Sequence, residues 1–217
     1  MMSSIDNFCV YLDAGHGGID RFGNYVTAPD KMWDHGDDVP TPLHDKGKFY
    51  EGVFNRDLCD AIKAELKAVG VDYMPLYEQV DDTPLRDRTD LANWLHTNYK
   101  PGILISNHAD AFPPNLSVHG FGAFIYSTLS PALGMAKNLY KRMNEEFTNE
   151  VKLREITVKN LHMTRESIMP AILIENGFFT NYNQATWLLK EDTIMRLAKV
   201  QRMMVMDYIN ENLNIHV

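Results

Sequence analysis

The sequence predicts a single α/β domain with a mixed, mostly parallel sheet of about six strands and helices on both faces. Short apolar runs alternate with segments of helical periodicity, the pattern of helices packed against a parallel sheet. The runs lack the polar alternation of half-exposed strands, so we expect them to be buried on both faces. The 217 residues show no repeats or long linkers, which indicates one domain over 1–217, with its core from about 8 to 212.

The first strand is expected from Val10 to Ala14. An irregular stretch from Gly17 to about Gly47 follows, rich in Gly, Pro, Asp and His. Loops of that length usually serve a site, so we interpret it as substrate-facing, with a surface excursion of no function as the alternative. Apolar residues then recur every four positions from 54 to 66, which predicts an amphipathic helix with Glu51 near its start and Gly70 as its stop.

The remaining elements follow from the same signals. Thr83 and Pro84 resemble an N-cap and a first helical residue. The apolar runs predict strands at 71–76, 103–107, 120–127, 161–164 and 171–174, and the periodic segments predict helices at 83–95, 131–147 and 193–212.

Composition excludes several classes of protein. The net charge is −8 and no Lys/Arg-rich run exists, which argues against binding to nucleic acid or an anionic membrane. No apolar stretch approaches the ~20 residues of a transmembrane span. Residues 1–7 lack the basic and apolar regions of a secretory signal, so we expect cytoplasmic synthesis and, for any work outside, another route of export. Cys9 and Cys59 are expected to be buried free thiols.

Four chemically active side chains occupy special places in this pattern. His16, His108 and Glu175 come at the ends of apolar runs, and Glu51 opens the first long helix. In α/β sheets the crevice beyond the carboxyl ends of the strands holds the chemistry. Two imidazoles and a carboxylate with an open fourth position are the ligands of catalytic zinc, and a second carboxylate can transfer the proton of an attacking water. The sequence therefore predicts a hydrolytic site with one zinc ion.

Each of these residues also has a simpler interpretation. His16 and His108 could be structural histidines, Glu51 could serve only the helix dipole, and Glu175 could form a structural pair with Arg165. His35 and His44, in the long loop, are the alternative metal ligands. No G-x-S-x-G elbow appears and neither cysteine has the setting of a nucleophile, so acyl-enzyme chemistry is not supported.

The motifs resemble those of the zinc-dependent N-acetylmuramoyl-L-alanine amidases of the type-3 family, the catalytic modules of cell-wall amidases and phage endolysins. The resemblance covers about residues 10–212. Its motifs are LDAGHGG at 12–18, Glu51 followed by Asn55, Arg88 with Ala92-Asn93, SNHAD at 106–110, and PAILIENGFFTN at 170–181.

The resemblance implies that His16, Glu51 and His108 bind one Zn²⁺ and that Glu175 is the catalytic carboxylate. The implied reaction is hydrolysis of the amide between N-acetylmuramic acid and the L-alanine of the stem peptide, with peptidoglycan or muropeptides as partners. Asp110 replaces the Asn usual in the family and is expected to lie behind the metal ligands.

Two further residues are candidates for substrate contact, Arg165 and Asn176. The alternative functions are another zinc amidohydrolase or carboxypeptidase acting on peptides, and a catalytically silent wall-binding protein.

Overall fold

The computed structural model describes residues 4–41 and 43–212. Its strands are β1 (Cys9–Ala14), β2 (Met32–Asp34), β3 (Lys48–Tyr50), β4 (Asp72–Pro75), β5 (Gly102–Asp110), β6 (Gly122–Ile125), β7 (Thr157–Val158) and β8 (Ala171–Phe178). Its α-helices are α1 (Glu51–Ala68), α2 (Leu85–Asn98), α3 (Ala132–Glu146), α4 (His162–Arg165), α5 (Tyr182–Leu188) and α6 (Glu191–Asn212). Short 3₁₀ turns form η1 (Ser4–Asn7) and η2 (Pro29–Lys31).

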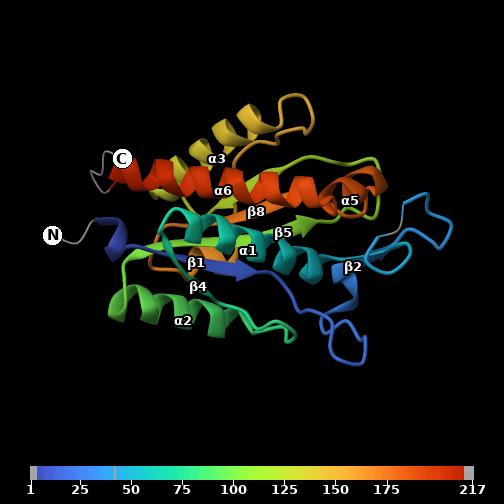
Figure 1. Cartoon of the computed structure of the whole chain (residues 1–217), viewed down its shortest axis with the longest axis horizontal. Coiled ribbons are helices and arrows are strands. Elements are labelled where there is room, and N and C mark those ends of the chain that lie inside the picture. The colour runs from blue at the N-terminus through green and yellow to red at the C-terminus, as the bar shows by residue number, and fades with distance from the viewer. Residues whose placement is uncertain (1–3, 42, 213–217) are drawn as a thin grey trace.

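Within the described ranges, six strands form the central sheet in the order β4-β1-β5-β8-β6-β7. β4, β1, β5 and β8 are parallel, whereas β6 runs antiparallel to β8. The inner strand β1 is buried along its whole length, because helices cover both of its faces. The carboxyl ends of β1 and β5 point the same way, and the β2–β3 hairpin lies beyond them (Figure 1).

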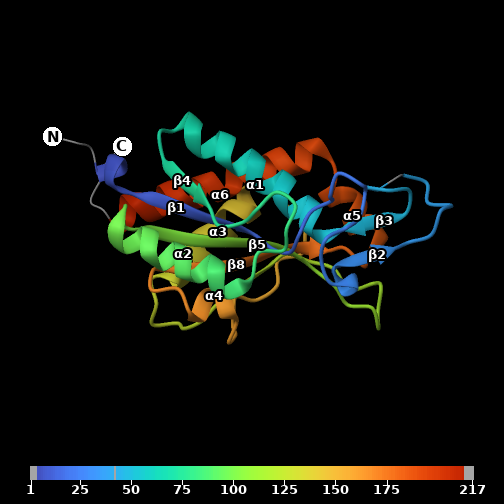
Figure 2. The same cartoon turned by 90° about the horizontal axis from the view of Figure 1, so that it is seen from below.

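Helices cover both faces of this sheet, as the sequence predicts (Figure 2). One face carries α1, α3 and α6, and its core includes Val10 and Leu12 of β1. The other carries α2 and α4, which pack with Tyr11 and Leu104. Burying a large aliphatic or aromatic side chain contributes ~1.5–3 kcal/mol, so alternating strand residues stabilise both layers. The expected α/β class and mostly parallel sheet are confirmed.

Most predicted elements are confirmed within a few residues, but the strand expected at 161–164 is wrong. This segment is the single turn α4, in which the Arg165 amide donates to the Leu161 carbonyl over 2.9 Å. Leu161 and Met163 alternate like strand residues, yet four residues are too few to distinguish the two periods. Thr83 is also not a helix cap, since its hydroxyl accepts from the Glu78 amide and α2 begins at Leu85.

The segment expected to be an irregular loop contains regular structure. Its residues form η2 and β2, and β2 pairs with β3, which directly follows the segment, with Met32 opposite Tyr50. The short elements β7 and α5 were also not predicted.

Three further expectations concern the chain as a whole. Cys9 and Cys59 are buried and free, as predicted. The expectation of cytoplasmic synthesis rests on residues 1–7, of which 1–3 lie outside the described residues. Across 4–41 and 43–212, no helix combines the length and the apolar character needed to cross a membrane.

Candidate metal centre

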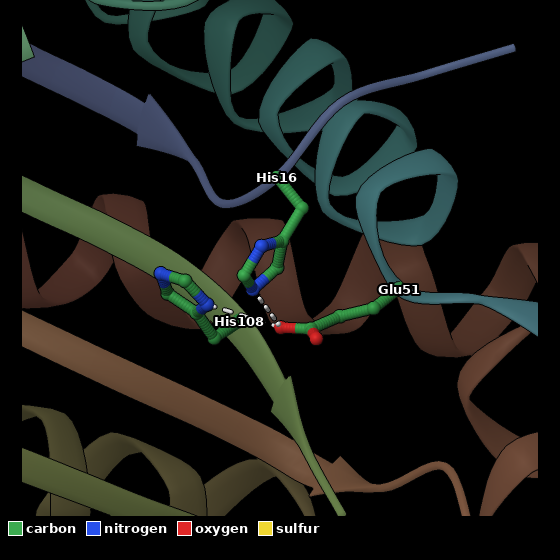
Figure 3. Close-up of side chains that lie close together, drawn as sticks. All are labelled: His16, Glu51 and His108. Carbon is green, nitrogen blue, oxygen red and sulfur yellow. Dashed lines mark hydrogen bonds and ion pairs between the residues drawn. The ribbon is translucent and has the colours of Figure 1, made fainter. Parts of the chain in front are cut away.

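Three elements bring His16, Glu51 and His108 together at the carboxyl end of the sheet. His16 follows β1 in the left-handed backbone region, with φ of 66°. Glu51 is the first residue of α1, where the helix dipole favours a carboxylate. His108 lies inside β5, two residues before its end rather than after it. The three side chains point toward one another (Figure 3).

One carboxylate oxygen lies at the centre of this triad. Glu51 Oε1 is 3.3 Å from His16 Nε2 and 3.0 Å from His108 Nδ1. The Ala109 amide also donates to it over 3.3 Å. The imidazole rings stand nearly perpendicular, at 83°, with their centroids 5.1 Å apart. Glu51 therefore fixes both histidines in one corner of the site.

Two glycines let the backbone approach closely enough to build this corner. A Cβ at Gly15 would lie 2.1 Å from Cε1 of His108, so a larger residue would displace that ring. A Cβ at Gly52 would lie 1.9 Å from the carbonyl oxygen of Gly17. The contact between Gly17 and Gly52 holds the segment after His16 against the first turn of α1.

The donor atoms suit a divalent transition metal. One nitrogen or oxygen from each of His16, Glu51 and His108 lies within 4.8 Å of the other two. Bonds of about 2.0–2.1 Å in a tetrahedral zinc site place ligand atoms about 3.3 Å apart, close to the separations from Glu51. The His16 and His108 side chains are 20% and 13% exposed, so the cluster opens to solvent on one side.

The electrostatics of the triad favour a bound cation. Burial opposes ionisation of Glu51, but hydrogen bonds and attraction from His108 and His16 outweigh it and lower its pKa to about 2. Burial also disfavours the charged form of His108, but Glu51 outweighs it and raises the pKa of His108 to about 9. The carboxylate thus stabilises positive charge at this position, whether it comes from a proton or from a metal.

Glu175 lies beside the triad but outside it. β8 pairs Glu175 with His108, and both residues line a cavity of about 490 Å³ together with His16 and Glu51. Glu175 Oε2 is buried and has no hydrogen-bond partner among the residues that the structure describes. Burial raises the pKa of Glu175 to about 8, with His108 lowering it and Glu51 raising it further. A carboxyl group of this kind can accept and return a proton near neutral pH.

The neighbouring Asp110 forms an ion pair that the sequence analysis did not predict. Its Oδ2 accepts a hydrogen bond of 2.9 Å from Arg154 Nη1, and Asp110 also lines the cavity. The guanidinium occupies the space left by Gly122, where a Cβ would lie 2.5 Å from Nη2. Arg154 therefore balances the charge that Asp110 adds beside Glu175.

The other candidate residues lie elsewhere. Arg165 pairs with Glu166 over 2.6 Å and borders a separate cavity of about 320 Å³. Asn176 is fully buried, and its amide donates to the His108 carbonyl over 3.0 Å, behind the cavity wall. His35 lies 2.9 Å from the Phe179 carbonyl, and His44 accepts from the amide of Tyr50, so neither belongs to the triad.

A buried arginine, Arg88, which the sequence analysis names as part of a family motif but to which it assigns no role, fixes the segment carrying His16. Arg88 Nη1 donates to Asp13 Oδ1 and to the Ala14 carbonyl, each over 2.6 Å, and Nη2 donates to the His16 carbonyl over 3.4 Å. Ser106 donates to the other Asp13 oxygen over 2.6 Å. Arg88 lies four residues before Ala92, on the same buried face of α2. This position on an otherwise apolar helix face is the sequence signal that could have shown Arg88 to be buried.

Replacing Arg88 with Met is expected to destabilise the protein by about 3–5 kcal/mol, because it leaves Asp13 buried without its cation. Denaturant unfolding checks this value. Arg86→Met is the matched control on the same helix, since Arg86 is 85% exposed and pairs with Asp90 over 3.4 Å; its effect should stay within about 0.5 kcal/mol. Equal losses in both variants would contradict the structural role of Arg88.

Comparisons with known proteins agree on one family. The family model Amidase_3, described as N-acetylmuramoyl-L-alanine amidase, matches residues 10–203. The chain is 34% identical over 118 residues to the N-acetylmuramoyl-L-alanine amidase CwlM of Bacillus licheniformis, and 31% identical over 118 residues to a sporulation-specific amidase of Bacillus subtilis. Each match covers 53% of this chain and 42% of the relative, so the chain spans less than half the length of these relatives.

Solved structures share the fold over nearly the whole chain. An N-acetylmuramoyl-L-alanine amidase of Clostridium difficile matches with a TM-score of 0.75 and 22% identity, covering 95% of this chain and 99% of that one. The catalytic domain of CwlV from Bacillus (Paenibacillus) polymyxa matches with a TM-score of 0.71 and 22% identity, covering 94% and 98%. Since the family model spans the first strand through most of α6, the chain belongs to the Amidase_3 family of N-acetylmuramoyl-L-alanine amidases.

Proposed function

We propose that this protein hydrolyses the amide between N-acetylmuramic acid and the L-alanine of the stem peptide in peptidoglycan, with one zinc ion held by His16, Glu51 and His108. The observation that carries the proposal is the placement of Glu175 opposite His108 in the cavity of the triad, with one carboxylate oxygen, Oε2, buried and without a hydrogen-bond partner among the described residues. Membership of the amidase family supports an amide as the bond that is hydrolysed.

The residues divide the chemistry among them. When bound, zinc supplies a Lewis acid that polarises a carbonyl oxygen and makes water acidic near neutral pH. Glu51 orients both imidazoles and contributes the negative charge of the ligand set. Glu175 accepts the proton of the attacking water and delivers it to the departing amine of alanine. Because Glu175 lies within the cavity, both transfers take place at the same carboxylate.

The experiment is digestion of purified sacculi and of a soluble muramoyl tripeptide by the zinc-loaded protein, followed by mass spectrometry. We expect lactyl-terminated N-acetylmuramic acid and a peptide with a new L-alanine amino terminus. The same tripeptide without muramic acid is the control and should remain intact. Trimming of that free peptide would instead favour a peptidase, and glycan fragments with intact stem peptides would contradict amidase activity.

A further inference from the structure

The cavity around the triad has different charges on its two sides. On the side of α1, Lys31 Nζ lies 3.5 Å from Asp30 Oδ2, so the two charges compensate each other. Tyr25 ties this side to the helix, because its hydroxyl donates to the Lys31 carbonyl over 3.0 Å and accepts from the Gly52 amide over 2.7 Å. On the side of β6, the cavity is lined by Lys159.

Lys159 is a cation without a carboxylate partner among the residues that the structure describes. Its Nζ lies 5.3 Å from the ring centroid of Phe124, which also lines the cavity. Its backbone is fixed at both ends, since its amide donates to the Ile125 carbonyl and its carbonyl accepts from the Leu161 amide, each over 3.0 Å. The backbone of this exposed lysine is therefore held at the cavity wall, and its ammonium group is available for an anion.

This arrangement contrasts with the other cations near the site. Arg154 is paired with Asp110 and Lys31 with Asp30. The whole chain has 29 acidic and 21 basic residues. In such an acidic protein an uncompensated lysine in the cavity indicates a position for negative charge from a ligand.

The sheet register gives the spacing between this lysine and the reacting group. β6 pairs Phe124 with Leu173, two residues before Glu175 on β8. Two residues of strand correspond to about 7 Å, and the step across the sheet from β8 to β6 adds about 4.8 Å at right angles, which gives about 8–9 Å between Glu175 and Phe124. An extended peptide advances about 3.3–3.6 Å per residue. If the scissile amide lies at Glu175, the part of the peptide beside Phe124 and Lys159 is therefore about two to three peptide residues away from it.

We propose that Lys159 binds a carboxylate of the acidic stem peptide, so that the peptide crosses β8 and β6 toward Lys159 and the neutral sugar lies on the side of Lys31. This inference rests on the proposed amidase function and adds the polarity of the bound substrate. Phe124 and Leu161 provide the apolar surface along which the peptide backbone and its methyl groups lie.

The test uses the zinc-loaded protein and three muramoyl tripeptides. One has all carboxylates free, one is amidated at the α-carboxylate of the second residue, and one is amidated at the C-terminus. We expect Lys159→Gln to lower kcat/KM about tenfold on the free substrate, mainly through KM, because one charge-assisted hydrogen bond is lost. On the substrate amidated at the bound carboxylate, the same variant should differ from the wild type by less than about twofold.

Two variants complete the design. Lys159→Arg keeps the charge and should preserve the preference for the free carboxylate. Lys152→Gln removes an exposed lysine of the preceding segment that does not line this cavity, and should leave all three rates unchanged. Thermal unfolding of each variant checks that the fold is intact.

For one of the two amidated substrates, kcat/KM should be the same for the wild type and Lys159→Gln. The carboxylate that is amidated in that substrate is the one that Lys159 binds. An equal effect of Lys159→Gln on all three substrates would overturn the inference, and so would no effect on any of them. Failure of the wild type to release L-alanine peptides from any substrate would instead contradict the proposed function, so the two failures are distinguishable.

Discussion

Replacing Glu175 with Gln should reduce turnover of a muramoyl peptide by about 10²–10⁴-fold, the contribution of a positioned general acid–base group. Glutamine keeps the size and polarity of the side chain but cannot accept and return a proton. The position is favourable for such a role, since Glu175 lies in the cavity opposite His108 and burial raises its pKa to about 8. Single-turnover rates at saturating substrate measure the loss.

Metal content separates this chemical role from a role as a ligand. Glu175→Gln should bind one metal ion as tightly as the wild type, because Glu175 is not part of the triad. Glu78→Gln, an exposed glutamate outside the cavity, is the matched control and should retain full activity. Undiminished turnover in Glu175→Gln would show that another group moves the proton.

Replacing His108 with Ala is expected to weaken metal binding by more than about 100-fold and to abolish activity. Changes to residues that only orient metal ligands already cost about 10–100-fold in affinity, and removal of a ligand atom should exceed them. Elemental analysis after dialysis against a weak chelator measures the bound metal. His119→Ala, at an exposed histidine, should keep a full complement, and equal metal content in both variants would exclude the triad as the site.

Metal binding should also release a proton, because the raised pKa of His108 keeps its imidazole charged at neutral pH in the metal-free protein. The pKa of about 9 lies above the ordinary value of 6.5, and metal binding requires the neutral ring. Affinity should therefore rise with pH up to about 9 and level off above it. Calorimetric titration in buffers of different ionisation enthalpy measures the released proton, and a pH-independent affinity would contradict this coupling.

The central sheet was predictable because β1, β5 and β8 are short apolar runs that helices bury on both faces. Short elements were not. α4 has four residues, and its conformation depends on the packing of Met163 beneath β8 and α2 rather than on its own pattern. The β2–β3 hairpin has three-residue strands, too short for alternation to be recognised.

Residues at strand ends were predictable in the same way, and the structure brings His16, Glu51 and His108 together. Ion pairs between residues far apart in the chain could not be predicted from the spacing of residues in the sequence. Arg154 reaches Asp110 from 44 positions away, into a space that exists only because residue 122 is glycine. Arg88 reaches Asp13 from 75 positions away. Such contacts depend on the layer order of the sheet, which no local pattern contains.

The two outer strands of the sheet are very short. β4 has four residues and ends in Pro75, which lacks an amide proton, and β7 has only two. The unpaired backbone groups of an exposed edge strand can form hydrogen bonds with a strand of another molecule. Because β4 and β7 are so short, and because Pro75 has no amide proton, few such groups are available here. Concentrated solutions of the folded protein should accordingly resist fibril-like association, leaving partly opened molecules as the main source of aggregates.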